Sequence, residues 1–138
     1  MVNLGGGCYL EILAIDETNK DIKGPRWMGI DYLTTPKITR WSLKSDDLDH
    51  DSNVLFKHND LMGVVDKGTR KTTDGNILSW QMTLPLSAPE VEVVPFITDW
   101  STSNMHPTDN LPEQCQLVGL DLYHTQPNVV EKLSLIHI

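Results

Sequence analysis

The sequence predicts an α+β domain whose central unit runs in the order strand, helix, strand, strand, strand. Apolar strand-like segments alternate with turn signals, and one polar segment, residues 48–58, has the capping residues and sparse apolar spacing of a helix. An Asp-Gly pair separates two of the strand-like segments and predicts a hairpin. At 138 residues, with 39% hydrophobic and 22% charged residues, the chain fits one domain with a real core.

The first predicted strand spans residues 8–16, CYLEILAID. It is apolar on both alternating faces, which is typical of a central strand covered on both sides. Residues 17–37 are polar and broken by glycines and prolines, so we expect a connection there, with a helical turn near residues 27–32.

The second predicted strand, residues 37–45, opens the central unit. Ser45 or Asp46 is placed to cap the helix over residues 48–58. The apolar positions of this helix are few: Leu48, Val54 and Leu55.

Three more strands complete the central unit. The first two, residues 61–70 and 76–86, form a hairpin around Asp74–Gly75, where the glycine supplies the positive φ of a tight turn. The third covers residues 91–100, and Pro95 within it indicates an edge strand or a bulge.

The C-terminal part of the chain is predicted to form a loop, a strand and a helix. The loop covers residues 101–114 and the strand residues 116–124. The helix covers residues 125–133, with Thr125 as cap and Pro127 tolerated in the first turn.

Charge and composition restrict the classes of partner. Eleven basic against nineteen acidic residues give a net charge of -8, which argues against nucleic acid and anionic membranes. The two cysteines stand alone and indicate neither a disulfide framework nor a zinc site. The N-terminus lacks the features of a signal peptide, and no apolar stretch approaches the length of a membrane span. We therefore expect a cytoplasmic protein.

Five segments together resemble the glyoxalase-like domain of the vicinal oxygen chelate superfamily, from Gly5 to about Leu133. No single motif is diagnostic, and the order and spacing carry the resemblance. The segments are GGGCYLEILAID, GPRWMGID, ITRWSLKSDDLD, TRKTTDGNILSWQMT, and VPFITDW with a following HP. The resemblance implies that each βαβββ module forms a cupped mixed sheet and that two modules face each other around a small-molecule pocket. Many members bind a divalent metal there through His and Glu.

The resemblance also implies a single domain over residues 1–132 that is incomplete at both ends. Residues 1–36 would be the end of one module, 37–100 one full module and 116–132 the start of the next. A module with open sheet edges is expected to pair with a second copy as a homodimer or to be poorly stable.

Residues 133–138, LSLIHI, are what a transposon adapter used in sequencing libraries encodes. We hypothesise that they are a sequencing-adapter scar. The alternative is that Leu133, Leu135 and Ile136 continue an amphipathic helix.

Glu11 is the first candidate site residue, because an isolated buried carboxylate must be paired, metal-bound or protonated. The resemblance matches it to a metal-binding glutamate, and it is also a candidate general base. Where many metal-binding relatives carry a histidine, this chain has Arg40, which cannot ligate a cation but can grip a carboxylate or phosphate. A divalent metal is therefore expected only if another histidine supplies the partner, and none is evident. The alternative is a solvated Glu11 or a Glu11–Arg40 ion pair.

Other candidates come from the strands and the long loop. His106 is a candidate acid/base group, against the alternative of a surface histidine. Asp99 corresponds by position to Glu11, and it is equally well explained as a strand-end residue. Arg70 is a candidate anion contact or an exposed charge. Three tryptophans are expected either in the core or on the pocket wall: Trp41, Trp80 and Trp100.

Two functions from different classes follow. The first is an enzyme acting on a small anionic organic molecule, of a lyase, isomerase or dioxygenase-like kind. The second is a non-catalytic small-molecule binder whose aromatic walls hold the ligand without proton transfer.

Overall fold

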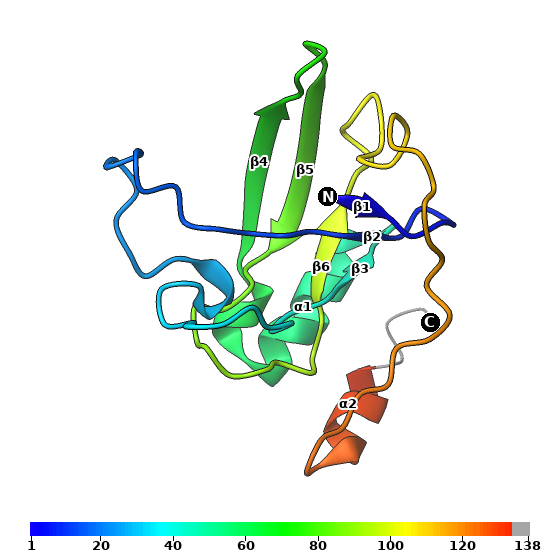
Figure 1. The fold of residues 1–138 in the computed structure, drawn as a ribbon. Coiled ribbons are helices and arrows are strands. Elements are labelled where there is room, and N and C mark those ends of the chain that lie inside the picture. The colour runs from blue at the N-terminus through cyan, green and yellow to red at the C-terminus, as the bar shows by residue number, and fades with distance from the viewer. Residues whose placement is uncertain (134–138) are drawn as a thin grey trace.

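The computed structural model describes residues 1–133, which form two sheets, two α-helices and two 3-10 turns (Figure 1). The elements follow in chain order: β1 Val2–Asn3, β2 Tyr9–Leu10, η1 Trp27–Gly29, β3 Ser42–Lys44, α1 Leu48–His58, η2 Asp60–Gly63, β4 Val65–Lys71, β5 Ile77–Thr83, β6 Phe96–Asp99 and α2 Pro127–Leu133.

The main sheet has the strand order β3-β6-β5-β4. Strands β3 and β6 run parallel, whereas the β6–β5 and β5–β4 pairs are antiparallel. The sheet is therefore mixed, and the element order β3, α1, β4, β5, β6 confirms the predicted βαβββ fold class.

Helix α1 starts and ends where the sequence predicts. Its N-cap, however, is Asp47 rather than Ser45 or Asp46, and the Asp47 side chain accepts a hydrogen bond from the His50 N–H at 3.1 Å. Ser45 instead accepts from the Asp47 N–H and donates to the buried Asp51 carboxylate at 2.6 Å. The capping prediction failed by one residue because three polar residues in a row all suit the role.

The core lies between α1 and one face of the sheet. Leu43 of β3 is directly opposite Ile97 of β6, and both belong to the cluster around the fully buried Leu55 of α1. Met62 and Leu133 complete this apolar layer from η2 and α2. Residues opposite each other on neighbouring strands share a face of the sheet. This face therefore packs against α1 and forms the hydrophobic core.

The opposite face of the sheet carries Trp80, Met82 and Thr98. Met82 is paired with Thr98, which precedes Asp99 and follows Ile97 on β6. Side chains alternate along a strand, so Thr98, Met82 and Trp80 all lie on the face away from α1. The N-terminal segment crosses this region in Figure 1, where the chain leaving β2 runs across the front of β4 and β5.

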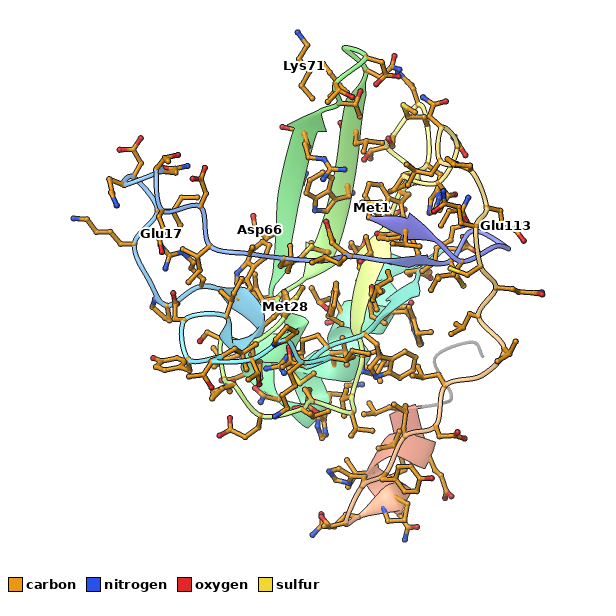
Figure 2. All side chains as sticks on the ribbon, in the orientation of Figure 1. Met1, Glu17, Met28, Asp66, Lys71 and Glu113 are labelled. Carbon is orange, nitrogen blue, oxygen red and sulfur yellow. The ribbon has the colours of Figure 1, made fainter. Side chains whose placement is uncertain are left out.

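The hairpin of β4 and β5 turns at Gly75, whose φ is 90°, as the Asp-Gly pair predicts. Its outer strand, β4, is a sheet edge with mostly exposed side chains, and Figure 2 shows Lys71 extending away from the hairpin. Residues 60–63 form η2 rather than the start of β4, so the predicted strand began too early.

The prediction of a central strand over residues 8–16 is wrong. Only Tyr9–Leu10 pairs, and its partner is the short β1. The next apolar side chains are solvent-exposed, with Ile12 at 71% and Leu13 at 47% of their full accessibility. The apolar pattern was real, but neither edge of the main sheet pairs with this segment among the described residues.

Three further sequence expectations need correction. Residues 116–124 form no strand, and Val118 is 96% exposed. Pro95 marks neither an edge nor a bulge within a strand, because it precedes β6, which lies between β3 and β5. The strand predicted over 37–45 pairs only at Ser42–Lys44.

Helix α2 begins at Pro127, as its predicted first-turn proline requires, and ends at the buried Leu133. The rest of the hypothesised adapter scar, residues 134–138, lies outside the described residues. Over residues 1–133, neither helix has the length and apolar character needed to cross a membrane.

Candidate functional site

Four rings from distant parts of the chain meet on the sheet face away from α1. Trp80 of β5 lies 5.4 Å from Trp100, which follows β6, and Trp100 lies 5.7 Å from His106 in the next loop. His106 in turn lies 5.9 Å from Tyr9 of β2. The contacts are edge-on or tilted, the arrangement that aromatic rings prefer. We call these four residues the ring series.

Trp80, the first residue of the ring series, packs against a glycine on the neighbouring strand. Gly68 of β4 is opposite Trp80, and a Cβ added at Gly68 would stand 2.3 Å from the indole. The indole therefore lies directly over the Gly68 backbone, in space that any other residue would fill. We therefore expect any side chain at position 68 to displace the Trp80 indole.

Beyond the ends of the parallel strands β3 and β6 is a cavity of about 360 Å³, which we call the strand-end pocket. Parallel strands place their carboxyl ends at the same edge of a sheet, a common position for ligand sites. The pocket is lined by Lys44, Asp46, Asp99, Trp100, Ser101, Ser103, Asn104, Met105, His106 and Asp109.

His106 is held in one orientation by its own loop. Its backbone N–H donates to Asp109 at 2.7 Å, and its Nδ1 lies 2.8 Å from the Thr108 hydroxyl. The Thr108 backbone N–H also donates to Nδ1, at 3.4 Å. A backbone N–H can only donate, so Nδ1 accepts and the neutral ring carries its proton on Nε2.

The surroundings of His106 favour its neutral form. Burial lowers the pKa of the imidazole, and Asp109 opposes this shift while the positive charge of Lys44 adds to it. At neutral pH, His106 therefore offers an N–H donor and a site that can accept a proton under mildly acidic conditions.

Tyr9 closes the ring series on the N-terminal side. The pKa of its hydroxyl is raised to about 12, first by burial and then by the charge of Glu11, while the charge of Arg70 acts in the opposite direction. The structure thus brings Glu11 and Arg70 into electrostatic reach of Tyr9, although both side chains are exposed. Among residues 1–133, neither forms a salt bridge.

Glu11 and Arg40 line a second, smaller hollow of about 120 Å³. It lies between residues 10–13, residues 28–33 and residues 37–40, and Figure 2 shows Met28 beside the segment that leaves β2. The two residues thus line one hollow, but the structure gives them no direct ion pair within the described chain.

The terminal N–H groups of Arg40 all donate hydrogen bonds to backbone carbonyls. Nη1 donates to the carbonyls of Thr39 and Glu90 at 2.7 and 2.6 Å. Nη2 donates to the carbonyls of Leu86 and Ala88 at 3.0 and 2.8 Å. Arg40 therefore fastens the loop 86–90 with three of its terminal N–H groups and binds Thr39 with the fourth, and only its Nε–H is left over.

The remaining predicted site residues are divided between the core side and the strand-end pocket. Trp41 is half-buried and donates its indole N–H to the Val93 carbonyl at 2.7 Å, which ties β3 to the chain before β6. Asp99 lines the strand-end pocket, where it accepts hydrogen bonds from the backbone and hydroxyl of Ser101. Trp100 and His106 line the same pocket.

A family model described as the glyoxalase-like domain matches residues 1–135. The chain belongs to the glyoxalase-like domain family. This confirms the resemblance to the vicinal oxygen chelate superfamily that the five sequence segments indicated. No curated protein and no solved structure matches the chain.

The family resemblance implied a divalent metal bound through His and Glu. Within residues 1–133, no group of three or more His, Cys, Asp or Glu side chains is arranged to hold such an ion, so the residues described do not fit the three-ligand site of a zinc-like ion. The hollow beside Glu11 is lined instead by apolar residues and by the cations Lys37 and Arg40, which repel a metal ion.

Sequence reasoning missed several residues of this glyoxalase-like site. Tyr9 was not among the predicted site residues, because its ring contact with His106, 97 positions away, has no local signal in the sequence. Lys44, Asp46 and Asp109 were also missed. The pattern His-Pro-Thr-Asp at residues 106–109 was available, because Thr and Asp at such spacing often bond to a loop backbone.

Proposed function

We propose that this glyoxalase-like domain is an enzyme that binds a small organic molecule in the strand-end pocket and exchanges a proton with it through His106. The single observation that carries the proposal is that the neutral, oriented imidazole of His106 and the indole of Trp100 line one cavity. A cavity with an apolar wall and a few fixed polar groups is the usual form of a ligand site.

His106 supplies the acid/base function in this proposal. Its Nδ1 is engaged by Thr108, so the Nε2–H is the atom that donates to a ligand oxygen. Because its pKa lies below the ordinary value, the ring is neutral at pH 7 and gains a proton only in more acidic solution. The ring can give its Nε2 proton to a ligand oxygen once Nδ1 has gained a proton from solvent, so that the imidazolium acts as a general acid and returns to the neutral form.

Charge decides which molecules the pocket favours. Three carboxylates line it, those of Asp46, Asp99 and Asp109, against the one ammonium of Lys44, which itself lies 3.4 Å from Asp46. An anion would be repelled, so we infer an uncharged ligand that presents a carbonyl or hydroxyl oxygen. The anionic ligand expected from the sequence depended on Arg40 and Arg70, and neither of them lines the strand-end pocket.

Benzamide and benzoate test this proposal, because they share shape and differ in charge. We expect benzamide to shift the His106 ring resonances and to quench the fluorescence of Trp100, with benzoate binding at least tenfold more weakly. Trp100→Leu should lose the response, whereas Trp27→Leu, a matched change at an exposed tryptophan outside the pocket, should keep it. Tighter binding of benzoate would restore the anionic ligand, and equal responses in both variants would reject the pocket.

A non-catalytic binder remains the second candidate, and one observation favours it. Glu11, the candidate general base, lines the other hollow, so the strand-end pocket has His106 as its one group suited to proton transfer at neutral pH among the described residues. Carbonyl compounds that bind would be followed by NMR for consumption. Turnover that disappears in His106→Gln while binding persists supports the enzyme, and binding without any consumption supports the binder.

We also propose that the chain associates with a second copy of itself. The support is the exposed apolar segment 117–123, where Val118 is 96% and Tyr123 is 88% exposed. Light scattering should show a dimer that Val118→Lys weakens and that Ile77→Lys, at an exposed isoleucine on β5, leaves intact. A monomer for the unchanged chain would contradict this proposal. The cytoplasmic location and the exclusion of nucleic acid stay predictions.

A further inference from the structure

The small hollow beside Glu11 has the features of a separate ligand site. Its wall is mostly apolar, and we call it the strap groove, after the N-terminal segment 10–13 that forms one side. Its lining includes Leu10, Leu13, Leu33, Lys37, Ile38 and Arg40. We propose that the strap groove binds a short aliphatic carboxylate, with its chain against the leucines and its carboxylate between Lys37 and the Nε–H of Arg40.

The size and lining of the strap groove suit a short aliphatic chain. About 120 Å³ is room for roughly four groups of the size of a water molecule or a methylene. Leu10, Leu13 and Ile38 keep 40%, 47% and 69% of their surface exposed, so a ligand chain would cover apolar surface that the protein itself leaves in water. Each added methylene that fits should tighten binding about fourfold.

The carboxylate of the ligand would be bound by the Arg40 Nε–H, a hydrogen-bond donor that has no partner within the described part of the chain. The Nε–H of Arg40 is buried and has no hydrogen-bond partner within the described part of the chain, while its four terminal N–H groups are all engaged. A buried donor without a partner is rare and unfavourable, so an oxygen that reached it would gain a charge-assisted hydrogen bond. Lys37 adds a second cation beside Arg40, against the one carboxylate of Glu11.

The N-terminal segment forms one side of the strap groove, which Arg40 also lines. After Leu10 this segment makes no strand pairing, and residues 11–16 are exposed. A small outward shift of the segment therefore breaks no sheet hydrogen bonds. The leucines of this segment then close over the aliphatic part of the ligand.

Pentanoate, pentanol and pentylamine are the probes for this proposal. The Arg40 Nε–H gives its own signal in a proton–nitrogen correlation spectrum, and we expect pentanoate to move it to the frequency of a carboxylate-bound group. Pentanol should bind at least tenfold more weakly, and pentylamine should leave the signal unchanged. Propanoate should bind about fifteenfold more weakly than pentanoate, because it lacks two methylenes.

Two matched variants keep the experiment decisive. Ile38→Asp places a negative charge at the rim of the groove on an exposed side chain, so the fold is retained and pentanoate binding should be lost. Ile77→Asp makes the same change at an exposed isoleucine on β5 that lines neither hollow, and binding should persist. Pentylamine binding equal to pentanoate, an unmoved Nε–H signal or equal loss in both variants would overturn the proposal.

This site is independent of the strand-end pocket. His106→Gln should leave pentanoate binding in the strap groove unchanged, and Ile38→Asp should leave the benzamide response unchanged. The failure of either proposal is therefore visible without the other.

Discussion

The indole of Trp80 lies directly over the backbone of Gly68, its partner across the β4–β5 ladder. Through Trp100, this contact reaches His106 and the strand-end pocket. The absence of a side chain at Gly68 thus leaves the space that the Trp80 indole occupies beside Trp100.

Gly68→Ala is expected to destabilise the domain. The added methyl would lie 2.3 Å from the indole, so Trp80 must move, and such overpacking costs about 1–3 kcal/mol. Chemical denaturation measures the loss, and near-ultraviolet circular dichroism reports the separation of Trp80 from Trp100.

Gly119→Ala is the matched control for this change, because a Cβ there meets nothing within 4 Å. It should be neutral or slightly stabilising, since alanine restricts the unfolded chain. An unchanged dichroism spectrum in Gly68→Ala would show that Trp80 does not depend on the glycine.

Arg40→Lys should destabilise the domain by about 2–4 kcal/mol, because a point cation cannot serve the carbonyls of Leu86, Ala88 and Glu90 together. Amide exchange should become faster in the loop 86–90. Lys67→Met, at an exposed position on β4, is the control and should change the free energy of unfolding by less than about 0.5 kcal/mol. Loss of stability without faster exchange in that loop would argue against the fastening role.

His106 makes stability depend on pH in the acidic range. Burial lowers the pKa of the folded imidazole below its ordinary value of 6.5, so near this pH the unfolded chain binds more protons than the folded one. The free energy of unfolding should therefore fall as the pH drops from 6.5 through the folded pKa.

Denaturation at a series of pH values measures this dependence. His106→Gln should flatten it, whereas His58→Gln, at an exposed histidine on α1, should not. The same slope in His106→Gln and in the unchanged chain would place the titrating group elsewhere.

The pKa of the Tyr9 hydroxyl depends on the charges of Glu11 and Arg70, so it tests whether both lie near Tyr9. Its pKa, about 12, is raised first by burial and then by Glu11, and Arg70 lowers it. Ultraviolet titration should show a lower Tyr9 pKa in Glu11→Gln and a higher one in Arg70→Met, while Tyr9→Phe should lose this step.

Glu17→Gln is the control for the Tyr9 titration. Figure 2 shows Glu17 on the loop at the far side of the N-terminal segment, so its removal should leave the Tyr9 pKa in place. Shifts of the same sign in Glu11→Gln and Arg70→Met would show that the two charges do not act on Tyr9 as the structure places them.

Several features of this chain were determined by the sequence alone. Helix α1 begins after a run of capping residues and ends at His58 as predicted, and Asp74–Gly75 forms the turn of the β4–β5 hairpin. These signals are local, because a cap or a turn is decided by residues within a few positions of each other. The order of elements and five segment motifs were sufficient to indicate the family.

Tertiary structure decided which apolar segments became strands. Residues 8–16 and 116–124 carry the apolar content of strands, yet a strand forms only where a neighbouring strand offers free backbone groups. Of these two segments, only Tyr9–Leu10 pairs with another strand among residues 1–133, whereas the Leu117 N–H makes a single hydrogen bond to the Leu4 carbonyl.

Tertiary structure also decided the composition of the site. It joined Tyr9 to His106 and directed Arg40 to carbonyls 46 to 50 positions away, and neither contact has a local signal in the sequence. Local patterns predict what a segment can form, and the partner that it meets in space determines what each side chain does.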